Sequence, residues 1–521
     1  MTGRIVHLPW WASVLAAAAG GYLLDVASPE LAWWPAAFAG AALILASVWQ
    51  QRWALGLLAG FVAGAAFWGP HISWLTLYLG PVPWLGLCAV MILWFALFGI
   101  AAAVATRGLA LLGRNGFRAW WIVLCQAAAA AGLWVLREEV QGAWPYGGFA
   151  WGRLAHTQAD GPLAQAVSWL GFAGLSGAIA FAVALPVAAV FLCRPRRVAL
   201  PALAGSLVIL VVLALAPAAA LPQTGTLRVA AVQGNSKSGI FDDRESGDVL
   251  RDHLVATERL LDELEAEREN VDVIVWPENS AEFGLPDNPL ASQRIARLAK
   301  RADAPIVVGT VLENPDGSYT NSSLVWSADG PEPVRYDKRY PVPFAEYMPN
   351  REFFHALAPD LVDLVQLEYA HGRLPAAFDV TTPAGAVRAG LAICFDIIFD
   401  AHAVGMVDEG AEVIFAQTNN ADFGRTDESA QQLAIARLRA VETGRALINI
   451  STVGTSAVVD PSGRDLAALE PFTADAMVAE VPLVTGKTSA LRLGSGIAAA
   501  WMIAGALGLA AGALSRMRGR R

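Results

Sequence analysis

Apolar residues dominate two parts of the chain, residues 9–221 and 491–514, whereas the stretch between them has the mixed pattern of a soluble domain. A membrane-spanning helix needs roughly 20 predominantly apolar residues. Eight apolar runs approach or exceed that length: residues 9–24, 31–49, 53–70, 82–106, 118–136, 162–192, 199–221 and 491–513. The pattern predicts a transmembrane helical domain of about seven spans at residues 1–221 and a C-terminal transmembrane helix at residues 491–513.

The basic residues are concentrated in every second one of the short connections that join these spans. If the N-terminus is cytoplasmic, the cytoplasmic segments hold twelve Arg and no acidic residue, whereas the opposite loops hold five acidic residues and two Arg. Cytoplasmic loops of membrane proteins carry the excess of Lys and Arg. We therefore predict a multi-pass membrane protein whose large domain, residues 226–486, lies on the extracytoplasmic face.

Composition narrows the function classes further. Hydrophobic residues make up 55% of the chain and charged residues 16%, against about 25% charged residues in soluble proteins. Subtracting the twelve cytoplasmic Arg from the net charge of −9 leaves −21 on the rest, which argues against a nucleic-acid partner. The seven His are scattered without metal-ligand spacing, so we expect neither a metal nor another cofactor.

The domain at residues 226–486 alternates between strand-like and helical patterns, which predicts an α/β or an α+β class with layered sheets. Helical periodicity occurs at about residues 245–269, 289–302 and 427–445, and turns at residues 315–317 and 461–463 mark hairpins. The strand-like runs are Leu227–Gln233, Val271–Trp276, Ile306–Leu312, Ser322–Ser327, Val387–Ile393, Val413–Ala416, Ala446–Ile450 and Ala476–Val481.

Residues 340–375 fit neither pattern. The stretch mixes five Pro with large apolar side chains, and a long loop inside a compact domain is usually functional or mobile. A lid lying on the bilayer surface and a loop packed on its own domain are equally favoured by this composition.

Of the four Cys, only Cys394 falls in the large domain, where it has no partner for a disulfide. It ends the apolar run Val387–Ile393, so its thiol is expected at a strand-to-turn junction. A nucleophile and a buried structural Cys are both compatible with that position.

Two further residues follow predicted strands. Glu278 comes directly after the apolar run ending in Trp276-Pro277, where partial burial would raise its pKa and suit a general base. Lys338 lies between two Tyr and is one of four Lys among 37 basic residues. Its ammonium could stabilise an oxyanion. A solvated loop Glu and a surface Lys remain the alternatives.

The order Glu278, Lys338 and Cys394, each at a strand end, resembles the nitrilase superfamily, whose fold is an αββα sandwich. The order of the parts is also similar to that of a family: it resembles the membrane-embedded branch of this superfamily, the apolipoprotein N-acyltransferases. In both, several spans precede such a domain and one last span follows it, and the resemblance covers essentially the whole chain. The motifs that carry this resemblance are Val232–Asn235, Trp276–Ser280, Asn321, Pro343–Pro349 and Arg437–Arg445.

The resemblance implies roles for individual residues. Cys394 would be the nucleophile, Glu278 the base and Lys338 the charge stabiliser, with Glu346 supporting them. Two positions depart from the family's pattern near the nucleophile, where Phe395-Asp396 stand in place of Tyr-Glu. Phe241, Asn321 and Phe423 are the expected substrate-binding residues, and Phe241 and Phe423 stand near positions where the family has Trp.

The implied reaction moves an acyl chain from a phospholipid, through a Cys thioester, to the N-terminal amine of the diacylglyceryl-cysteine of a lipoprotein. The enzyme would be a monomer in the bacterial cytoplasmic (inner) membrane. A membrane-tethered amidase hydrolysing a small amide is the alternative enzyme. A non-catalytic scaffold or transporter would instead have the three residues far apart and charged residues facing inward from the spans, of which the sequence shows almost none.

Overall fold

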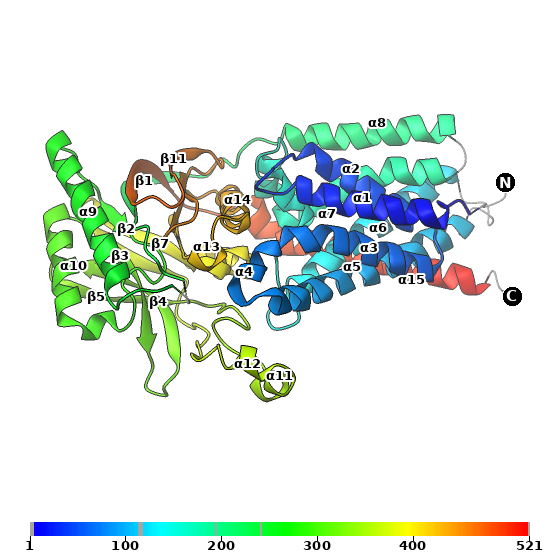
Figure 1. Ribbon diagram of the computed structural model, residues 1–521. Coiled ribbons are helices and arrows are strands. Elements are labelled where there is room, and N and C mark those ends of the chain that lie inside the picture. Colours follow the sequence, from blue (N-terminus) through cyan, green and yellow to red (C-terminus); the bar gives the residue numbers. More distant parts are fainter. Residues whose placement is uncertain (1–4, 113–117, 193–194, 240–241, 519–521) are drawn as a thin grey trace. The chain divides into compact units, whose positions relative to one another are not determined.

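The computed structural model describes residues 5–112, 118–192, 195–239 and 242–518 (Figure 1). The chain forms two compact units, a helical unit of residues 1–218 and 489–521 and an α/β unit of residues 219–488. Phe241, one of the expected substrate-binding residues, lies outside the described residues.

The helical unit contains one main helix for each of the eight predicted apolar runs. Within the described ranges, five helices are long and apolar enough to span a membrane: α3, α5, α6, α7 and α15. The bounds are α1 (Trp10–Val26), α2 (Pro35–Val48), α3 (Trp53–His71), α4 (Thr76–Leu79), α5 (Pro81–Ala110), α6 (Ala119–Gln141), α7 (Val167–Phe191), α8 (Pro195–Ala214) and α15 (Ser489–Arg518). The apolar helices α1, α2 and the Val198–Ala214 part of α8 are shorter.

Helix α6 corrects one expectation about charge. It continues to Gln141, five residues beyond the predicted run, and carries Arg137 and Glu138 into the interior of the helical unit. Glu138 Oε1 accepts hydrogen bonds from the Arg137 guanidinium at 3.1 Å and from Leu154 N at 2.9 Å. The sequence-based expectation that the spans carry almost no inward-facing charged residues was therefore wrong for α6. The two charges are tolerated because they neutralise each other and are hydrogen-bonded.

The α/β unit is built on two six-stranded sheets, in the orders β12-β1-β2-β3-β4-β5 and β11-β10-β9-β8-β7-β6. The first sheet contains β1 (Gln223–Gln233), β2 (Val273–Val275), β3 (Ile306–Glu313), β4 (Tyr319–Ser327), β5 (Gly330–Asp337) and β12 (Asp475–Val484). The second contains β6 (Ala377–Thr382), β7 (Gly385–Ile393), β8 (Val413–Thr418), β9 (Leu447–Ser451), β10 (Ser456–Val459) and β11 (Asp465–Leu469).

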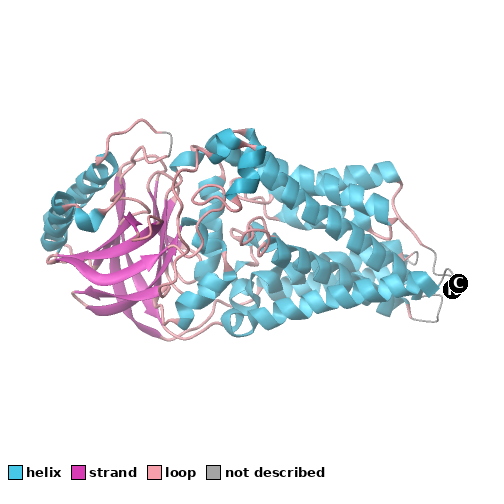
Figure 2. Ribbon diagram, turned by 90° about the horizontal axis from the view of Figure 1, so that it is seen from below, coloured by secondary structure: helices cyan, strands magenta, loops and turns pink. Residues whose placement is uncertain are grey.

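The two sheets face each other and a pair of helices covers the outer side of each (Figure 2). Helices α9 (Asp248–Glu267) and α10 (Pro289–Ala302) bury their apolar faces on the first sheet. Helices α13 (Asp400–Asp408) and α14 (Glu428–Thr443) cover the second. The predicted fold class, an αββα sandwich together with a multi-helix apolar region, is confirmed.

Four strands are missing from the strand-like runs found in the sequence: β5, β6, β10 and β11. The strand end expected at Lys338 is that of β5. Three of the four are edge strands, and edge strands face water along one side and tolerate Pro and polar residues. Strand β5 carries two Pro and lacks a continuous apolar run. The predicted turns at residues 315–317 and 461–463 do connect hairpins, β3–β4 and β10–β11.

The irregular segment 340–375 folds around a small apolar core of its own, formed by Met348, Val362 and Val365. It includes two short helices, α11 (Arg351–Leu357) and α12 (Pro359–Val362). Its last residues hydrogen-bond to the α/β unit, where Gly372 N donates to Lys338 O at 2.8 Å. The segment thus packs on its own domain, while contact with a bilayer stays a prediction.

Candidate active site

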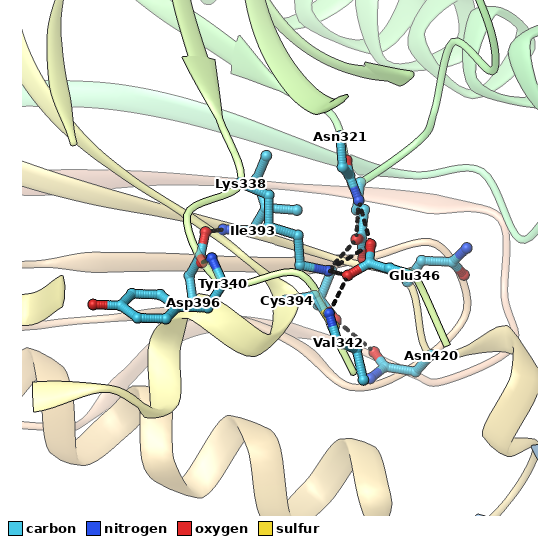
Figure 3. A network of polar contacts seen from close by, with 12 residues as sticks. Asn321, Lys338, Tyr340, Val342, Glu346, Ile393, Cys394, Asp396 and Asn420 are labelled. Carbon is cyan, nitrogen blue, oxygen red and sulfur yellow. Dashed lines mark hydrogen bonds and ion pairs between the residues drawn. The ribbon is translucent and has the colours of Figure 1, made fainter. Parts of the chain in front are cut away.

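The structure brings together the three residues expected to carry chemistry. Figure 3 labels two of them, Lys338 and Cys394. Glu278 follows β2, Lys338 follows β5 and Cys394 follows β7. Strands β2 and β5 run in the same direction, because two antiparallel pairings separate β3 from β5, so both end at one edge of their sheet. Cys394 is supplied by the opposing sheet, so the site lies where the carboxyl ends of strands from both sheets meet.

Lys338 is at the centre of the site and is 2% exposed. Its Nζ lies 3.1 Å from Glu278 Oε1 and 2.9 Å from Glu346 Oε2. Burial lowers the pKa of Lys338, but the two carboxylates outweigh burial and hold that pKa well above its usual value. Lys338 therefore remains a cation in the buried site.

The Asn321 side chain hydrogen-bonds to both carboxylates that contact Lys338. Its Nδ2 donates to Glu278 Oε1 at 2.6 Å and to Glu346 Oε1 at 3.1 Å. Glu346 Oε2 also accepts from Val342 N at 2.6 Å, which fixes it beside Lys338. The Asn321 amide thus positions both carboxylates. Its expected contact with substrate stays a prediction.

Two carboxylates beside one ammonium leave a surplus negative charge, and this charge attracts a proton. The pKa of Glu278 is raised by burial and by Glu346, although Lys338 opposes the shift. Burial and the Glu278 carboxylate also raise the pKa of the Cys394 thiol, against the opposing effect of Lys338. The thiol is thus protonated at neutral pH, and nucleophilic attack by sulfur requires a base to take its proton.

Cys394 begins the 3-10 helix Cys394–Ile398 with a backbone φ of +49°, in a region that residues other than Gly rarely occupy. Asp396, which is fully buried, stabilises this turn. Its Oδ2 accepts from Ile393 N at 3.1 Å and from Tyr336 Oη at 2.6 Å, and its Oδ1 accepts from Tyr340 N at 2.9 Å. Asp396 therefore links the Cys394 turn to the Lys338 segment.

Helix α14 holds the Cys394 turn through the side chain of Arg439. The Arg439 side chain is fully buried and donates to Ile397 O at 3.0 Å and to Ile398 O at 2.7 Å. Its charge is balanced by Glu442 at 2.5 Å and Asp400 at 2.7 Å. This explains in physical terms why the Arg437–Arg445 motif accompanies the three site residues.

The turn that carries Glu278 is held by contacts across the sandwich. Gln417 Nε2 on β8 donates to Trp276 O at 2.6 Å. Gly309 on β3 lets the turn approach closely, since a Cβ added there would lie 2.4 Å from Pro277 O and 2.9 Å from Glu278 Cα. The Trp276–Ser280 motif thus depends on a bare backbone at Gly309.

The Val232–Asn235 motif has a structural role. Gln233 is fully buried, and its Nε2 donates to Glu470 O at 3.0 Å and to Thr473 O at 2.8 Å. Its Oε1 accepts from Ser456 Oγ at 2.7 Å, so the side chain joins the two sheets.

Phe395 and Phe423 are half-buried and stand outside this hydrogen-bonded cluster. Phe395 packs edge-on against Phe399, with ring centroids 5.1 Å apart. Phe423 ends the 3-10 helix Ala421–Phe423, in the loop after β8. Their contact with a substrate stays a prediction.

The sequence interpretation missed three buried polar residues around Cys394: Asn420, Glu428 and Gln432. Gln432 Nε2 lies 3.5 Å from Cys394 Sγ. The available signal was the polar start of the predicted helix at residues 427–445, which follows the pair Asn419-Asn420 after six intervening residues. In the described part of the chain, no group of three or more His, Cys, Asp or Glu is arranged to hold a metal ion.

Comparison with known sequences gives the family. The model of the carbon-nitrogen hydrolase family matches residues 228–489, and that of the apolipoprotein N-acyltransferase N-terminal domain matches residues 20–185. The apolipoprotein N-acyltransferase of Mycolicibacterium smegmatis is 33% identical over 95% of this chain and 84% of its own length. The chain belongs to the apolipoprotein N-acyltransferase family.

A second apolipoprotein N-acyltransferase, of Azotobacter vinelandii, is 30% identical over 99% of this chain and 98% of its own length. Among solved structures, Saccharomyces cerevisiae Nit3 of the nitrilase superfamily aligns with 51% of this chain and 93% of its own, with 17% identity and a TM-score of 0.37. Apolipoprotein N-acyltransferases are acyltransferases of lipoprotein maturation, so this chain is a multi-pass membrane enzyme of that class.

Gly309→Ala should shift the position of Glu278 without changing its side chain. The new methyl group must displace the Pro277–Glu278 backbone, and a misplacement of about 1 Å costs on the order of 100-fold in rate. We expect about that loss in acyl transfer from the purified variant in detergent. The control is Gly225→Ala on β1, where the nearest atom is 3.7 Å from the added Cβ. Equal rates in the two variants would contradict the role given to the Gly309 contact.

Glu346→Gln should change the pH dependence in a defined direction. A base acts when ionised, so the rate rises with pH through the pKa of Glu278. Because the Glu346 charge raises that pKa, its removal should move the acidic limb of the rate profile to lower pH, while the maximal rate falls. The measurement is the rate of acyl transfer against pH, with exposed Glu352→Gln as the control. A limb that moves to higher pH would refute the assignment.

Proposed function

We propose that this acyltransferase works through a thioester on Cys394, with a phospholipid as acyl donor and the N-terminal diacylglyceryl-cysteine of a lipoprotein as acceptor. The observation that carries the proposal is the buried Glu278–Lys338–Glu346 cluster beside Cys394, in a chain of this family. Each half of the reaction needs a proton moved and an oxyanion stabilised, and the cluster supplies one group for each task.

In the first half-reaction, Glu278 takes the thiol proton as Cys394 Sγ attacks an ester carbonyl of the phospholipid. The Lys338 ammonium stabilises the oxyanion that forms. The carbon–oxygen bond then breaks, and the departing alkoxide takes the proton from Glu278. The lysophospholipid leaves and the acyl chain stays on sulfur.

In the second half-reaction, the neutral α-amine of the acceptor attacks the thioester carbonyl, and ionised Glu278 takes a proton from the attacking nitrogen. The carbon–sulfur bond breaks, and the thiolate recovers a proton from Glu278. The product is an amide, and Cys394 returns to its starting state.

The proposal also places the chain in its membrane. Residues 1–221 form the membrane domain, residues 226–486 the catalytic domain and residues 491–513 the last span, in the bacterial cytoplasmic membrane. The distribution of Arg favours a catalytic domain on the extracytoplasmic face. We propose that the enzyme acts as a monomer.

The segment 340–375 supplies a surface suited to lipid. Phe353, Leu357 and Leu364 are 60%, 68% and 46% exposed, while other apolar side chains of the segment form its small core. Exposed large apolar side chains grouped on one segment are typical of contact with a membrane or partner. We propose that these residues meet acyl chains at the bilayer surface.

The decisive role of Glu278 can be tested in the first half-reaction alone. Glu278→Gln keeps the shape of the side chain but cannot accept the thiol proton. We expect the burst of lysophospholipid release to slow by about 100-fold or more, with phospholipid binding retained. Glu263→Gln on the exposed face of α9 is the matched control. A burst of normal rate in Glu278→Gln would remove Glu278 as the base.

The amidase alternative predicts a different fate for the acyl group. The acyltransferase should release lysophospholipid in a single burst without acceptor and should turn over when a diacylglyceryl-cysteine peptide is added. An amidase would instead turn over with water and hydrolyse a small amide without any lipoprotein peptide. Steady turnover of that kind by the full chain would favour the alternative.

A further inference from the structure

Gln432 contacts the sulfur of Cys394 from helix α14, an element that contributes no residue to the Glu278–Lys338–Glu346 cluster. The residue lies in the second turn of α14 and is buried. Its Nε2 donates to Cys394 Sγ across 3.5 Å, a normal distance for a hydrogen bond to sulfur. Gln432 is therefore in direct contact with the atom that attacks.

The orientation of the Gln432 amide follows from its neighbours. Its Oε1 accepts from Asn420 Nδ2 at 2.8 Å and from Thr418 Oγ1 at 2.9 Å. With the oxygen held on that side, the NH₂ group must face Cys394. A flipped amide would place two donors against each other at Asn420.

Asn420 is connected in turn to a backbone group through Ser451. Gly454 N, which can only donate, gives its hydrogen to Ser451 Oγ at 2.8 Å. The Ser451 hydroxyl then donates to Asn420 Oδ1 at 2.6 Å. Because its oxygen is occupied there, the Asn420 NH₂ group faces Gln432 and Glu428. One chain of donors thus runs from a backbone N–H to the sulfur.

We propose that Gln432 is a further catalytic residue, which stabilises the Cys394 thiolate by donating a hydrogen bond to its sulfur. This inference rests on the proposed role of Cys394 as nucleophile. Negative charge develops on sulfur when Glu278 takes the thiol proton, and again when the acceptor amine displaces it. A hydrogen bond to the charged form lowers the pKa of a group.

The charges around the sulfur show why such a donor is needed. Burial and the Glu278 charge raise the pKa of Cys394 most, Glu346 and the ionised form of Glu428 raise it further, and Lys338 lowers it. Burial raises the pKa of Glu428 to about 8, so this carboxyl is mostly neutral at pH 7. Its Oε2 accepts from Asn420 Nδ2 at 2.7 Å, which completes the support of the Gln432 amide.

The test measures the reactivity of the thiol and does not depend on acyl transfer. The full chain in detergent is alkylated with iodoacetamide over a range of pH, and the mass of the peptide containing Cys394 reports that thiol separately from Cys88, Cys125 and Cys193. Gln432→Met fills a similar volume without a donor. The rate of alkylation rises with pH as the thiol ionises, and we call this rise the alkylation limb. We expect the limb of Gln432→Met to lie about one unit higher in pH, and the rate at neutral pH to fall about tenfold.

Gln432→Glu keeps the acceptor oxygen but replaces the donor by a carboxyl, and should move the limb further upward than Gln432→Met. Gln431→Leu, the loss of the adjacent buried amide on α14, is the control and should leave the limb in place. The order wild type, Gln432→Met, Gln432→Glu is not expected from a general loosening of the fold.

An unchanged limb in folded Gln432→Met overturns the inference. If Gln432→Met does not fold, Gln432→Glu decides, and a limb at or below the wild-type position overturns it equally. A shifted limb in a protein that never forms an acyl adduct leaves the Gln432 hydrogen bond intact and refutes only the proposed thioester. The two proposals can therefore fail separately.

Discussion

The Lys338 ammonium, held between the Glu278 and Glu346 carboxylates, is the interaction on which the rest of the site depends. Three charges in a buried position are stable only when each has partners, and losing one partner leaves an uncompensated charge. The resulting surplus of negative charge raises the pKa of Glu278 and of Cys394 together. It therefore favours proton transfer during attack over a preformed thiolate, and it makes any donor to the sulfur valuable.

The sandwich holds this arrangement through contacts that cross between its layers. Asp396 links the Cys394 turn of the second sheet to the Lys338 segment of the first, and Gln417 links β8 to the Glu278 turn. Arg439 fastens the same Cys394 turn to α14. Side chains that reach from one layer to another position reacting groups more rigidly than loops do, which is what a buried charge cluster requires.

The apolar runs and strand ends were readable from the sequence because they reflect local chemistry. Glu278 and Cys394 each end an unbroken apolar run, and the family resemblance supplied Lys338 after β5, a strand with no such run. The contact of Gln432 with Cys394 joins residues 38 positions apart through the packing of α14, which no local pattern records. The burial of Arg137 and Glu138 was missed for the same reason, because it depends on their partners Trp134 and Leu154.

The most direct measurement is mass spectrometry of the full chain after incubation with phospholipid in the absence of acceptor. The proposed mechanism predicts one acyl chain on the peptide containing Cys394, removable by hydroxylamine and absent from Cys394→Ala. Addition of a diacylglyceryl-cysteine peptide should discharge it. An acyl chain on a different residue, or a hydroxylamine-sensitive adduct that persists in Cys394→Ala, would contradict the mechanism.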